Sequence, residues 1–381
     1  MSERKFAEVF PPGEFIQEEL EARDWKQVDL ADIIGCSPKV INELVLGKRS
    51  ITPDTAKALG DAFGTSAQYW MNLESAYQLW KTQNADEAIA RRSRLYSLAP
   101  IKEMTKRGWI EPSENVEVLE TRVLRFFEIK SLDDKPEFSH AARKPTSYSE
   151  ITPAQLAWLF RARHLARAVH ATSFTEQSLN DALNRLKTLL TNKEEIGRVP
   201  KILAECGIRL IVVEPLPKTR IDGVTFWLDE KSPVIALSVR FDRIDWFWHT
   251  LAHELGHINL EDGLKEQIKL DVDLVGDNAL SFDQQTGNER LADIFATEFL
   301  VKQTELEDFI VRVRPLYGKL RIMGFARRLE VHPGIVVGQL QHRRQIQWSY
   351  YRDLLEKVRN IITQTALTDG WGHKPTLPTY A

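Results

Sequence analysis

Two histidines four residues apart, His253 and His257, enclose Glu254 in a run of mostly apolar residues. If this run is helical, the two imidazoles project from one face, one turn apart. That spacing suits a small tetrahedral ion such as zinc, which takes two nitrogen ligands from neighbouring turns. Glu254 stands beside the first histidine and can reach a water molecule at the metal without becoming a ligand. The alternative is two packed or surface histidines that flank a glutamate.

A second segment, residues 288–296, offers the acid that such a site needs. Glu289 and Asp293 lie four residues apart, and most positions around them are apolar. In a site of two histidines and one glutamate, the first acid binds the metal and the second accepts the free N–H of a liganding histidine. The alternative is a solvated acidic helix face. His249, one turn before His253, is expected near the cleft, where it either assists a transition state or is simply packed.

Gly256 lies inside the apolar run, where glycine costs about 1 kcal/mol relative to alanine, so we expect another element to pack closely there. The strand that precedes this run is expected to hold an extended peptide by edge pairing.

From about residue 200 to 340 the chain resembles the ImmA/IrrE family of metallopeptidases. The resemblance is carried by the strand-forming segments before the site, by His253-Glu254-Leu255-Gly256-His257 and by Glu289-x-x-Ala292-Asp293-x-Phe295-Ala296. It implies His253, His257 and Glu289 as ligands of one zinc ion per chain. It also implies Glu254 as the general base of a peptide hydrolysis in which zinc activates the water.

Residues 14–75 read as short amphipathic helices separated by turn signals. Within them, residues 27–46 have the organisation of a helix-turn-helix, with small Ala31 at the helix crossing and Gly35 in the turn. Ser37 is expected to cap the second helix of the pair.

Six polar side chains of this segment are candidates for DNA contacts, namely Gln27, Ser37, Lys39, Asn42, Lys48 and Arg49. Lys48 and Arg49 are expected to meet phosphates, and Lys39 and Asn42 base edges. Residues 1–74 carry 8 Lys and Arg against 13 Asp and Glu. Binding therefore depends on local contacts, and a helical interaction domain that does not bind DNA is the alternative.

Residues 12–80 resemble the HigA branch of the Cro/C1-type (XRE) DNA-binding family. The resemblance is carried by Pro12-Gly13-Glu14, Gln27-x-x-Leu30-Ala31, Gly35-Cys36-Ser37, Asn42-Glu43, Gly47-Lys48-Arg49-Ser50-Ile51-Thr52-Pro53 and the run from Phe63 to Leu73. It implies a repressor or antitoxin that binds palindromic, double-stranded operator DNA as a homodimer.

The chain as a whole is expected to be mainly α with a small β-sheet (α+β). Three strand-like runs lie at 208–213, 224–228 and 234–239, between helical segments. A second helix-turn-helix echo at 326–336 is expected to serve packing, with His332 as a helix cap. We expect four parts: a five-helix Cro/C1-type helix-turn-helix domain (1–80), a charged helical connector (81–150), a gluzincin-like zinc peptidase domain (151–345), and a C-terminal helix and tail (346–381).

Composition points to a cytoplasmic protein without a membrane partner. The 381 residues are 43% hydrophobic and 28% charged, and the net charge is −3. No apolar run reaches the length of a membrane span or a signal peptide. The two cysteines, Cys36 and Cys206, cannot build a disulfide framework, which favours a reducing compartment.

The two motif sets together predict a DNA-binding regulator with a zinc endopeptidase domain that cleaves a regulatory protein or itself. One alternative is an antitoxin-type repressor of a toxin partner, with the zinc domain as a non-catalytic sensing or interaction module. Another is a zinc hydrolase with a non-peptide substrate.

Overall fold

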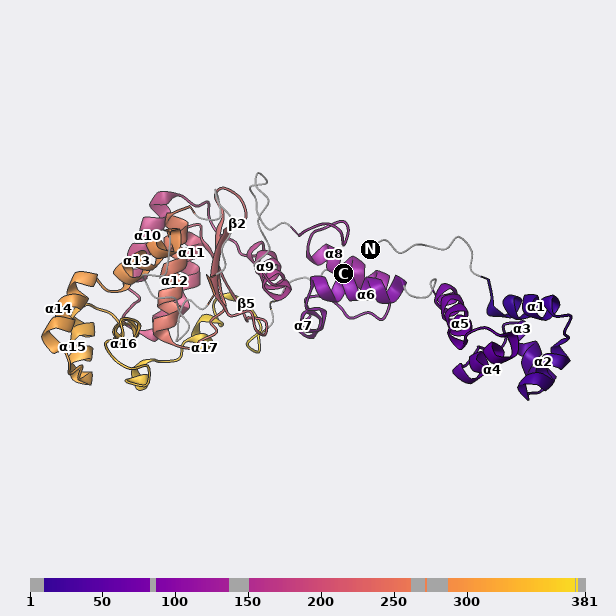
Figure 1. Cartoon of the computed structure of the whole chain (residues 1–381). Helices are drawn as coiled ribbons and strands as arrows, with labels where there is room; N and C mark the ends of the chain where they lie inside the picture. Colours follow the sequence, from indigo (N-terminus) through magenta and orange to yellow (C-terminus); the bar gives the residue numbers. More distant parts are fainter. Residues whose placement is uncertain are drawn as a thin grey trace. The chain divides into compact units, whose positions relative to one another are not determined.

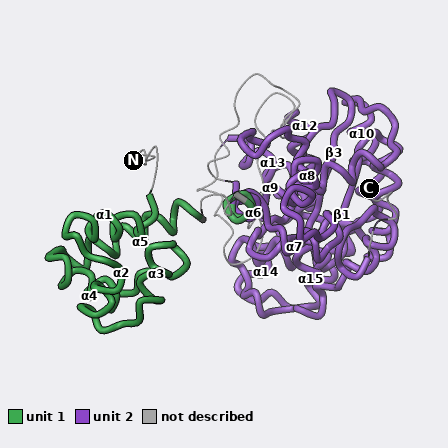
Figure 2. The backbone as a smooth tube through the Cα atoms, turned by 90° about the vertical axis from the view of Figure 1, so that its right-hand side faces the viewer, with its two compact units in different colours: residues 1–93 green, residues 94–381 purple. Residues whose placement is uncertain are grey.

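The computed structural model of the chain describes residues 10–82, 87–136, 151–261, 271–272, 287–373 and 375. The backbone divides into two compact units, Met1–Ser93 and Arg94–Ala381 (Figure 2). No helix among the described residues is long and apolar enough to cross a membrane.

The first unit contains the five helices that the sequence predicts (Figure 1). They are α1 (Pro12–Ala22), α2 (Gln27–Ile34), α3 (Pro38–Val45), α4 (Pro53–Phe63) and α5 (Ala67–Thr82). Three of them begin with proline, whose fixed φ suits the first helical turn and whose missing N–H costs nothing there. Their apolar faces enclose one core, which includes Ile16, Leu20, Leu30, Ile41, Leu59 and Trp70.

The turn between α2 and α3 has the expected form, with one difference at its cap. Gly35 ends α2 in the left-handed conformation (φ 71°), which costs glycine little because it has no Cβ. Ala31 is fully buried at the crossing. Ser37 occupies the cap position of α3, but its side chain accepts no capping hydrogen bond, so that expectation is wrong. Pro38, next to it, already removes one of the N–H groups that a cap would satisfy.

The second unit is built on a five-stranded sheet with the order β4-β2-β3-β1-β5. The strands are β1 (Arg209–Val213), β2 (Ile221–Trp227), β3 (Pro233–Leu237), β4 (Asp271–Val272) and β5 (Leu367–Asp369). β1 runs parallel to β3 and β5, whereas β2 is antiparallel to β3 and β4. β3 is therefore an interior strand, and the expectation that it pairs with a peptide through a free edge is wrong.

Side chains alternate across this sheet into two helical layers. Leu210 and Val212 of β1 enter one core, and Ile211 and Val213 enter the other. Figure 1 shows α9 on one side of the sheet and α10 to α13 on the other. The helices are α6 (Glu87–Leu98), α7 (Ile101–Lys106), α8 (Val116–Phe126), α9 (Pro153–Ala166), α10 (Glu176–Lys187), α11 (Val199–Glu205), α12 (Ile244–Asn259), α13 (Gly287–Leu300), α14 (Gln303–Val313), α15 (Lys319–Arg328), α16 (Pro333–His342) and α17 (Arg359–Ile362). Two 3₁₀ helices lie at Lys193–Arg198 and Arg352–Leu354.

Much of the segment expected as a charged connector belongs instead to the second core. Met104, Trp109, Leu119 and Phe127 are all buried against α9 and the sheet. The described charged side chains of this segment are exposed or half-buried. They interrupt the apolar pattern in the sequence, so the burial of these helices was not predicted. Residues 83–86 and 137–150 of the expected connector lie outside the described part of the chain.

The last part of the chain also differs from the expected helix and tail. Its described residues form the 3₁₀ helix Arg352–Leu354, the short α17 and then β5, which pairs with β1 through Ile211 and Leu367. In contrast, the second helix-turn-helix echo packs as predicted. Val336 and Val337 of α16 are fully buried. His332 caps that helix, because its Nδ1 accepts a hydrogen bond from the Gly334 N–H (3.1 Å).

Candidate metal centre and DNA-binding head

Helix α12 holds the predicted metal-binding residues on a buried face. Leu251, Ala252 and Leu255 anchor it in the core, and none of them is exposed to solvent. His253 and Glu254 are likewise fully buried, and His257 is 5% exposed. The polar residues therefore form a notch in an otherwise apolar helix, where an unpaired charge or a bare imidazole would be costly.

The three predicted ligands converge. His253 Nε2 and His257 Nε2 lie 3.0 Å apart, and Glu289 Oε2 lies 3.5 Å from the first and 3.6 Å from the second. Ligand atoms at about 2.0–2.1 Å from a tetrahedral zinc ion stand about 3.3–3.4 Å from one another. The chain thus presents two imidazole nitrogens and one carboxylate oxygen at distances that a small tetrahedral ion fits.

Asp293 lies behind the first histidine, one turn after Glu289 on α13. Its Oδ1 is 3.3 Å from His253 Nδ1 and 3.3 Å from His249 Nε2. Burial alone would raise the pKa of Asp293, but hydrogen bonds from the two imidazoles outweigh it and hold that pKa well below the usual range. The ionised carboxylate fixes the proton of His253 on Nδ1, which leaves the Nε2 lone pair directed at the other ligands.

Glu254 is held by strand β2. Its Oε2 lies 2.8 Å from the Thr225 hydroxyl, which also lies 3.0 Å from the Glu254 carbonyl oxygen. A Cβ added at Gly223 would stand 2.1 Å from Glu254 Oε1, so only glycine leaves room for this carboxylate. Neither Gly223 nor Thr225 was predicted. The available signal was a glycine inside a strand of β-branched residues, which often marks a close approach.

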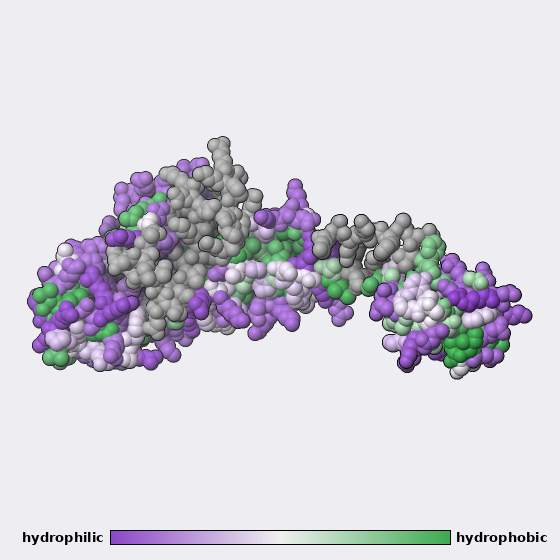
Figure 3. All heavy atoms as spheres, viewed as in Figure 1, coloured by the Kyte–Doolittle hydropathy of each residue, from purple (hydrophilic) through white to green (hydrophobic). Residues whose placement is uncertain are grey.

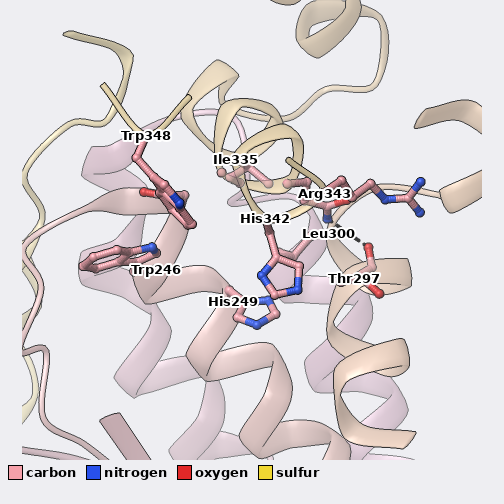
Figure 4. Close-up of a pocket in the computed structure, with 11 residues that line it drawn as sticks. Trp246, His249, Thr297, Leu300, Ile335, His342, Arg343 and Trp348 are labelled. Carbon is pink, nitrogen blue, oxygen red and sulfur yellow. Dashed lines mark hydrogen bonds between the residues drawn. The ribbon is translucent and has the colours of Figure 1, made fainter. Parts of the chain in front are cut away.

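His249 is placed away from the ligand atoms. It shares the Asp293 carboxylate with His253, and its ring faces His342 at a centroid distance of 6.2 Å. The two rings border a cavity of about 50 Å³ whose other walls include Trp246 and Trp348 (Figure 4). Burial lowers the pKa of His342, and His249 adds to that effect. The arrangement favours a positioning role for His249 over direct contact with a substrate.

In the first unit, the predicted DNA-contacting residues cluster around α3. Ser37, Lys39, Asn42, Lys48 and Arg49 are exposed, and Gln27 is half-buried. The ion pairs that the neighbouring acid Glu43 makes with these residues were not predicted. Glu43 Oε2 accepts a hydrogen bond from Arg49 Nε (3.1 Å), and Glu43 Oε1 lies 3.9 Å from Lys39 Nζ. One carboxylate therefore partly neutralises two of the candidate DNA contacts.

Comparison with known proteins assigns both parts of the chain. Residues 16–70 match the helix-turn-helix family model, and residues 205–341 match the model of the IrrE N-terminal-like domain. Virulence-associated protein I of Dichelobacter nodosus is 39% identical over 79 residues, which are 20% of this chain and 73% of that protein. The uncharacterized HTH-type transcriptional regulator YddM of Escherichia coli (strain K12) is 31% identical over 84 residues, 22% of this chain and 88% of that protein.

A solved structure titled as the Pseudomonas aeruginosa antitoxin HigA with the higBA promoter is 38% identical, covering 21% of this chain and 87% of that chain at a TM-score of 0.20. The family matches fall on the two segments that carry the helix-turn-helix and the histidine cluster. The chain belongs to the XRE-type helix-turn-helix regulators, and C-terminal to the helix-turn-helix segment it carries an IrrE N-terminal-like domain of the ImmA/IrrE metallopeptidase family.

Proposed function

We propose that this regulator is also a zinc-dependent endopeptidase, which cleaves a regulatory protein or its own chain and binds double-stranded operator DNA as a homodimer. The observation that carries the peptidase half is the convergence of His253, His257 and Glu289, with the Glu254 carboxylate one residue from the first ligand. The exposed polar face of α3 supports the DNA-binding half.

Zinc, when bound by these three side chains, lowers the pKa of water toward about 7 and polarises a carbonyl group. Glu254 supplies the proton transfers. Its carboxylate accepts a proton from the attacking water and passes it to the amine that leaves. Thr225 holds one carboxylate oxygen and so directs the other toward the reaction. Asp293 keeps His253 in the required tautomer and orientation.

Strand β2 is the element along which we place an extended substrate. It lies against α12 at Glu254, and in the described residues β4 pairs with it at Ile221 and Gly223. The part of β2 beyond Gly223 pairs with β3 on one side. A peptide main chain aligned there would bring its carbonyl groups past Glu254.

The test compares the full-length wild type with Glu254→Gln. Both proteins should bind about one zinc per chain by elemental analysis, because Glu254 is not a ligand. With zinc, only the wild type should cleave itself or a protein encoded beside it, as followed by intact mass. A zinc-loaded wild type that leaves its own chain and all neighbouring gene products uncut contradicts the peptidase half.

A second candidate is an antitoxin-type repressor in which the zinc domain senses or binds without cleaving. It is favoured by apolar surface on the head. Leu79 and Trp80 at the end of α5 are 68% and 46% exposed, and Tyr77 stacks on Trp80. On the same unit, Figure 3 also shows a compact hydrophobic patch that lies lower in the view than α5, near α2 and α4. Capture of a small co-encoded toxin, with unchanged repression by Glu254→Gln, supports this candidate over the first.

A further inference from the structure

A large cleft lies in the helical layer that covers the sheet face opposite α12. It encloses about 550 Å³ between the loop after α7, helix α8 and helix α9. Pockets for small molecules in proteins span about 300–1,000 Å³. The sheet separates this cleft from the metal centre, since the cleft helices pack on Ile211 and Val213 while α12 packs on Leu210 and Val212.

One wall of the cleft contains two aromatic rings that stack on each other, and the guanidinium groups of Arg107 and Arg161 lie over the Trp109 ring. The rings of Trp109 and Phe126 stack at a centroid distance of 6.1 Å and an interplanar angle of 7°. Both side chains are more than nine-tenths buried. The indole Nε1 of Trp109 donates no hydrogen bond within the described part of the chain. Leaving a buried N–H unpaired is unfavourable, so this donor favours a bound acceptor.

The other wall is basic. Four arginines and two glutamates line the cleft, which gives the lining a net charge of +2. Arg161 is compensated from outside the cleft by Asp369, and Arg122 by Glu111 in the lining. The lining charges that remain are those of Arg125, Arg167 and Glu128, and the Glu128 carboxylate pairs both with Arg167 and with Arg163, which lies outside the lining.

Glu128 acts as an internal anion in this cluster. Its carboxylate binds two guanidinium groups and also lies 3.2 Å from His164 Nε2. Burial lowers the pKa of His164 to about 4, and the arginines act in the same direction against Glu128, so the imidazole is neutral near pH 7. The single Glu128 carboxylate is thus shared by two permanently charged side chains, Arg163 and Arg167, beside the cleft.

We propose that this cleft binds a small aromatic anion, whose ring enters the cleft beside Trp109 and Phe126 and whose carboxylate or phosphate pairs with Arg167 and Arg125. Guanidinium groups bind both anions through paired, charge-assisted hydrogen bonds. Glu128 competes with the ligand for Arg167. Removal of Glu128 therefore strengthens binding, whereas removal of the arginine weakens it.

The experiment uses the full-length protein and isothermal titration calorimetry with three probes of one shape: 2-naphthoate, 2-naphthyl phosphate and uncharged 2-naphthol. We expect at least one of the two anions to bind about tenfold or more tightly than 2-naphthol, because charged hydrogen bonds are lost with the head group. The better anion shows whether the site prefers a carboxylate or a phosphate.

Two variants should change the affinity for the anion in opposite directions, and a third is the control. Arg167→Gln should weaken anion binding about tenfold, and Glu128→Gln should strengthen it several-fold. Arg328→Gln, which removes an arginine of similar exposure from an ion pair with Glu305 on α14 and α15, should leave it unchanged. Equal binding of the three probes, or equal loss in Arg167→Gln and Arg328→Gln, overturns the proposal. Should Glu128→Gln not fold, the half-exposed Arg167 variant and the 2-naphthol comparison still decide it.

Discussion

Gly256 of α12 faces the backbone of Ala292 in α13: a Cβ added at Gly256 would lie 3.0 Å from the Ala292 Cα and 3.2 Å from its carbonyl oxygen. These are backbone atoms, so no side-chain rotation can make room. The close approach of the two helices brings the first turn of α13, which carries Glu289, to the histidines of α12. A glycine that weakens its own helix thereby completes the ligand set.

Gly256→Ala should lower zinc affinity about tenfold, because α13 must move away and Glu289 moves with it. The fold itself should survive, since alanine favours the helix by about 1 kcal/mol. Gly324→Ala is the matched control, because Gly324 lies in α15 with no atom within 4 Å of an added Cβ. Zinc competition titrations with a chromophoric chelator and thermal melts of the zinc-free proteins separate the two effects. Equal zinc affinity in both variants contradicts the role given to Gly256.

Thr225→Val should reduce kcat about ten- to hundredfold while zinc content stays at the wild-type level, with peptide cleavage and elemental analysis as the measurements. The change keeps the shape of the side chain but removes the hydroxyl that holds Glu254 Oε2. Thr368→Val is the control, because Thr368 is a buried strand threonine whose hydroxyl makes no hydrogen bond within the described residues. If Thr368→Val reduces kcat as much as Thr225→Val does, the effect belongs to the sheet and not to Glu254.

Asp293→Asn should weaken zinc binding about 10- to 100-fold, because an amide oxygen is a poorer acceptor for the His253 Nδ1–H than the ionised carboxylate. His249→Phe keeps the contact between Asp293 and His253, and its effect on zinc affinity should be smaller. Equilibrium titrations of both variants measure the difference. A large loss of kcat in His249→Phe at unchanged zinc affinity would instead make His249 a catalytic residue.

Helical spacing explains why the metal ligands could be predicted while their support could not. His253, His257, Glu289 and Asp293 sit at intervals of four on two helices, so sequence alone places each pair on one face. Thr225 reaches Glu254 across 29 positions, and only the pairing of β2 with β3 brings the strand there. Such contacts depend on topology, which residue spacing does not encode.

The same reason accounts for the missed elements of the fold. β5 is three residues long, and it is a strand only because β1 offers it a parallel partner. α8 lies in the segment that was expected to be a helical connector. Its burial was not predicted because its outer face is charged, although Leu119, Val123 and Phe126 have helical spacing and are buried. Short or strongly charged elements carry little periodic signal of their own and are stabilised by tertiary packing.

Lowering the pH from 7.5 to 5.5 should destabilise the second unit through His164. Its pKa is about 4 in the folded chain and about 6.5 when unfolded. Between these values the unfolded chain binds a proton that the folded chain does not, so stability falls as pH falls through that window. The expected contribution at pH 5.5 is about 1 kcal/mol.

Urea unfolding of the wild type and His164→Gln at the two pH values measures this contribution. The loss of ring contacts with Phe126 lowers the stability of the variant at both pH values. The variant should lack only the pH-dependent contribution of His164. The free energies of unfolding of the two proteins should therefore differ less at pH 5.5 than at pH 7.5. A constant difference across the two pH values would show that His164 does not titrate as its burial demands.

Glu43→Gln should strengthen DNA binding several-fold. Glu43 binds Arg49 and attracts Lys39, so its neutralisation frees two cations for phosphates and removes a negative charge from the face of α3. The plot of log affinity against log salt concentration should steepen by about one unit for each additional phosphate that the protein neutralises. Glu18→Gln changes the net charge equally at an exposed position of α1 and is the control. Fluorescence anisotropy with the protein's own promoter region and with an unrelated duplex supplies both quantities. If the two variants strengthen binding equally, the effect is one of total charge, and Arg49 is not a DNA contact that Glu43 restrains.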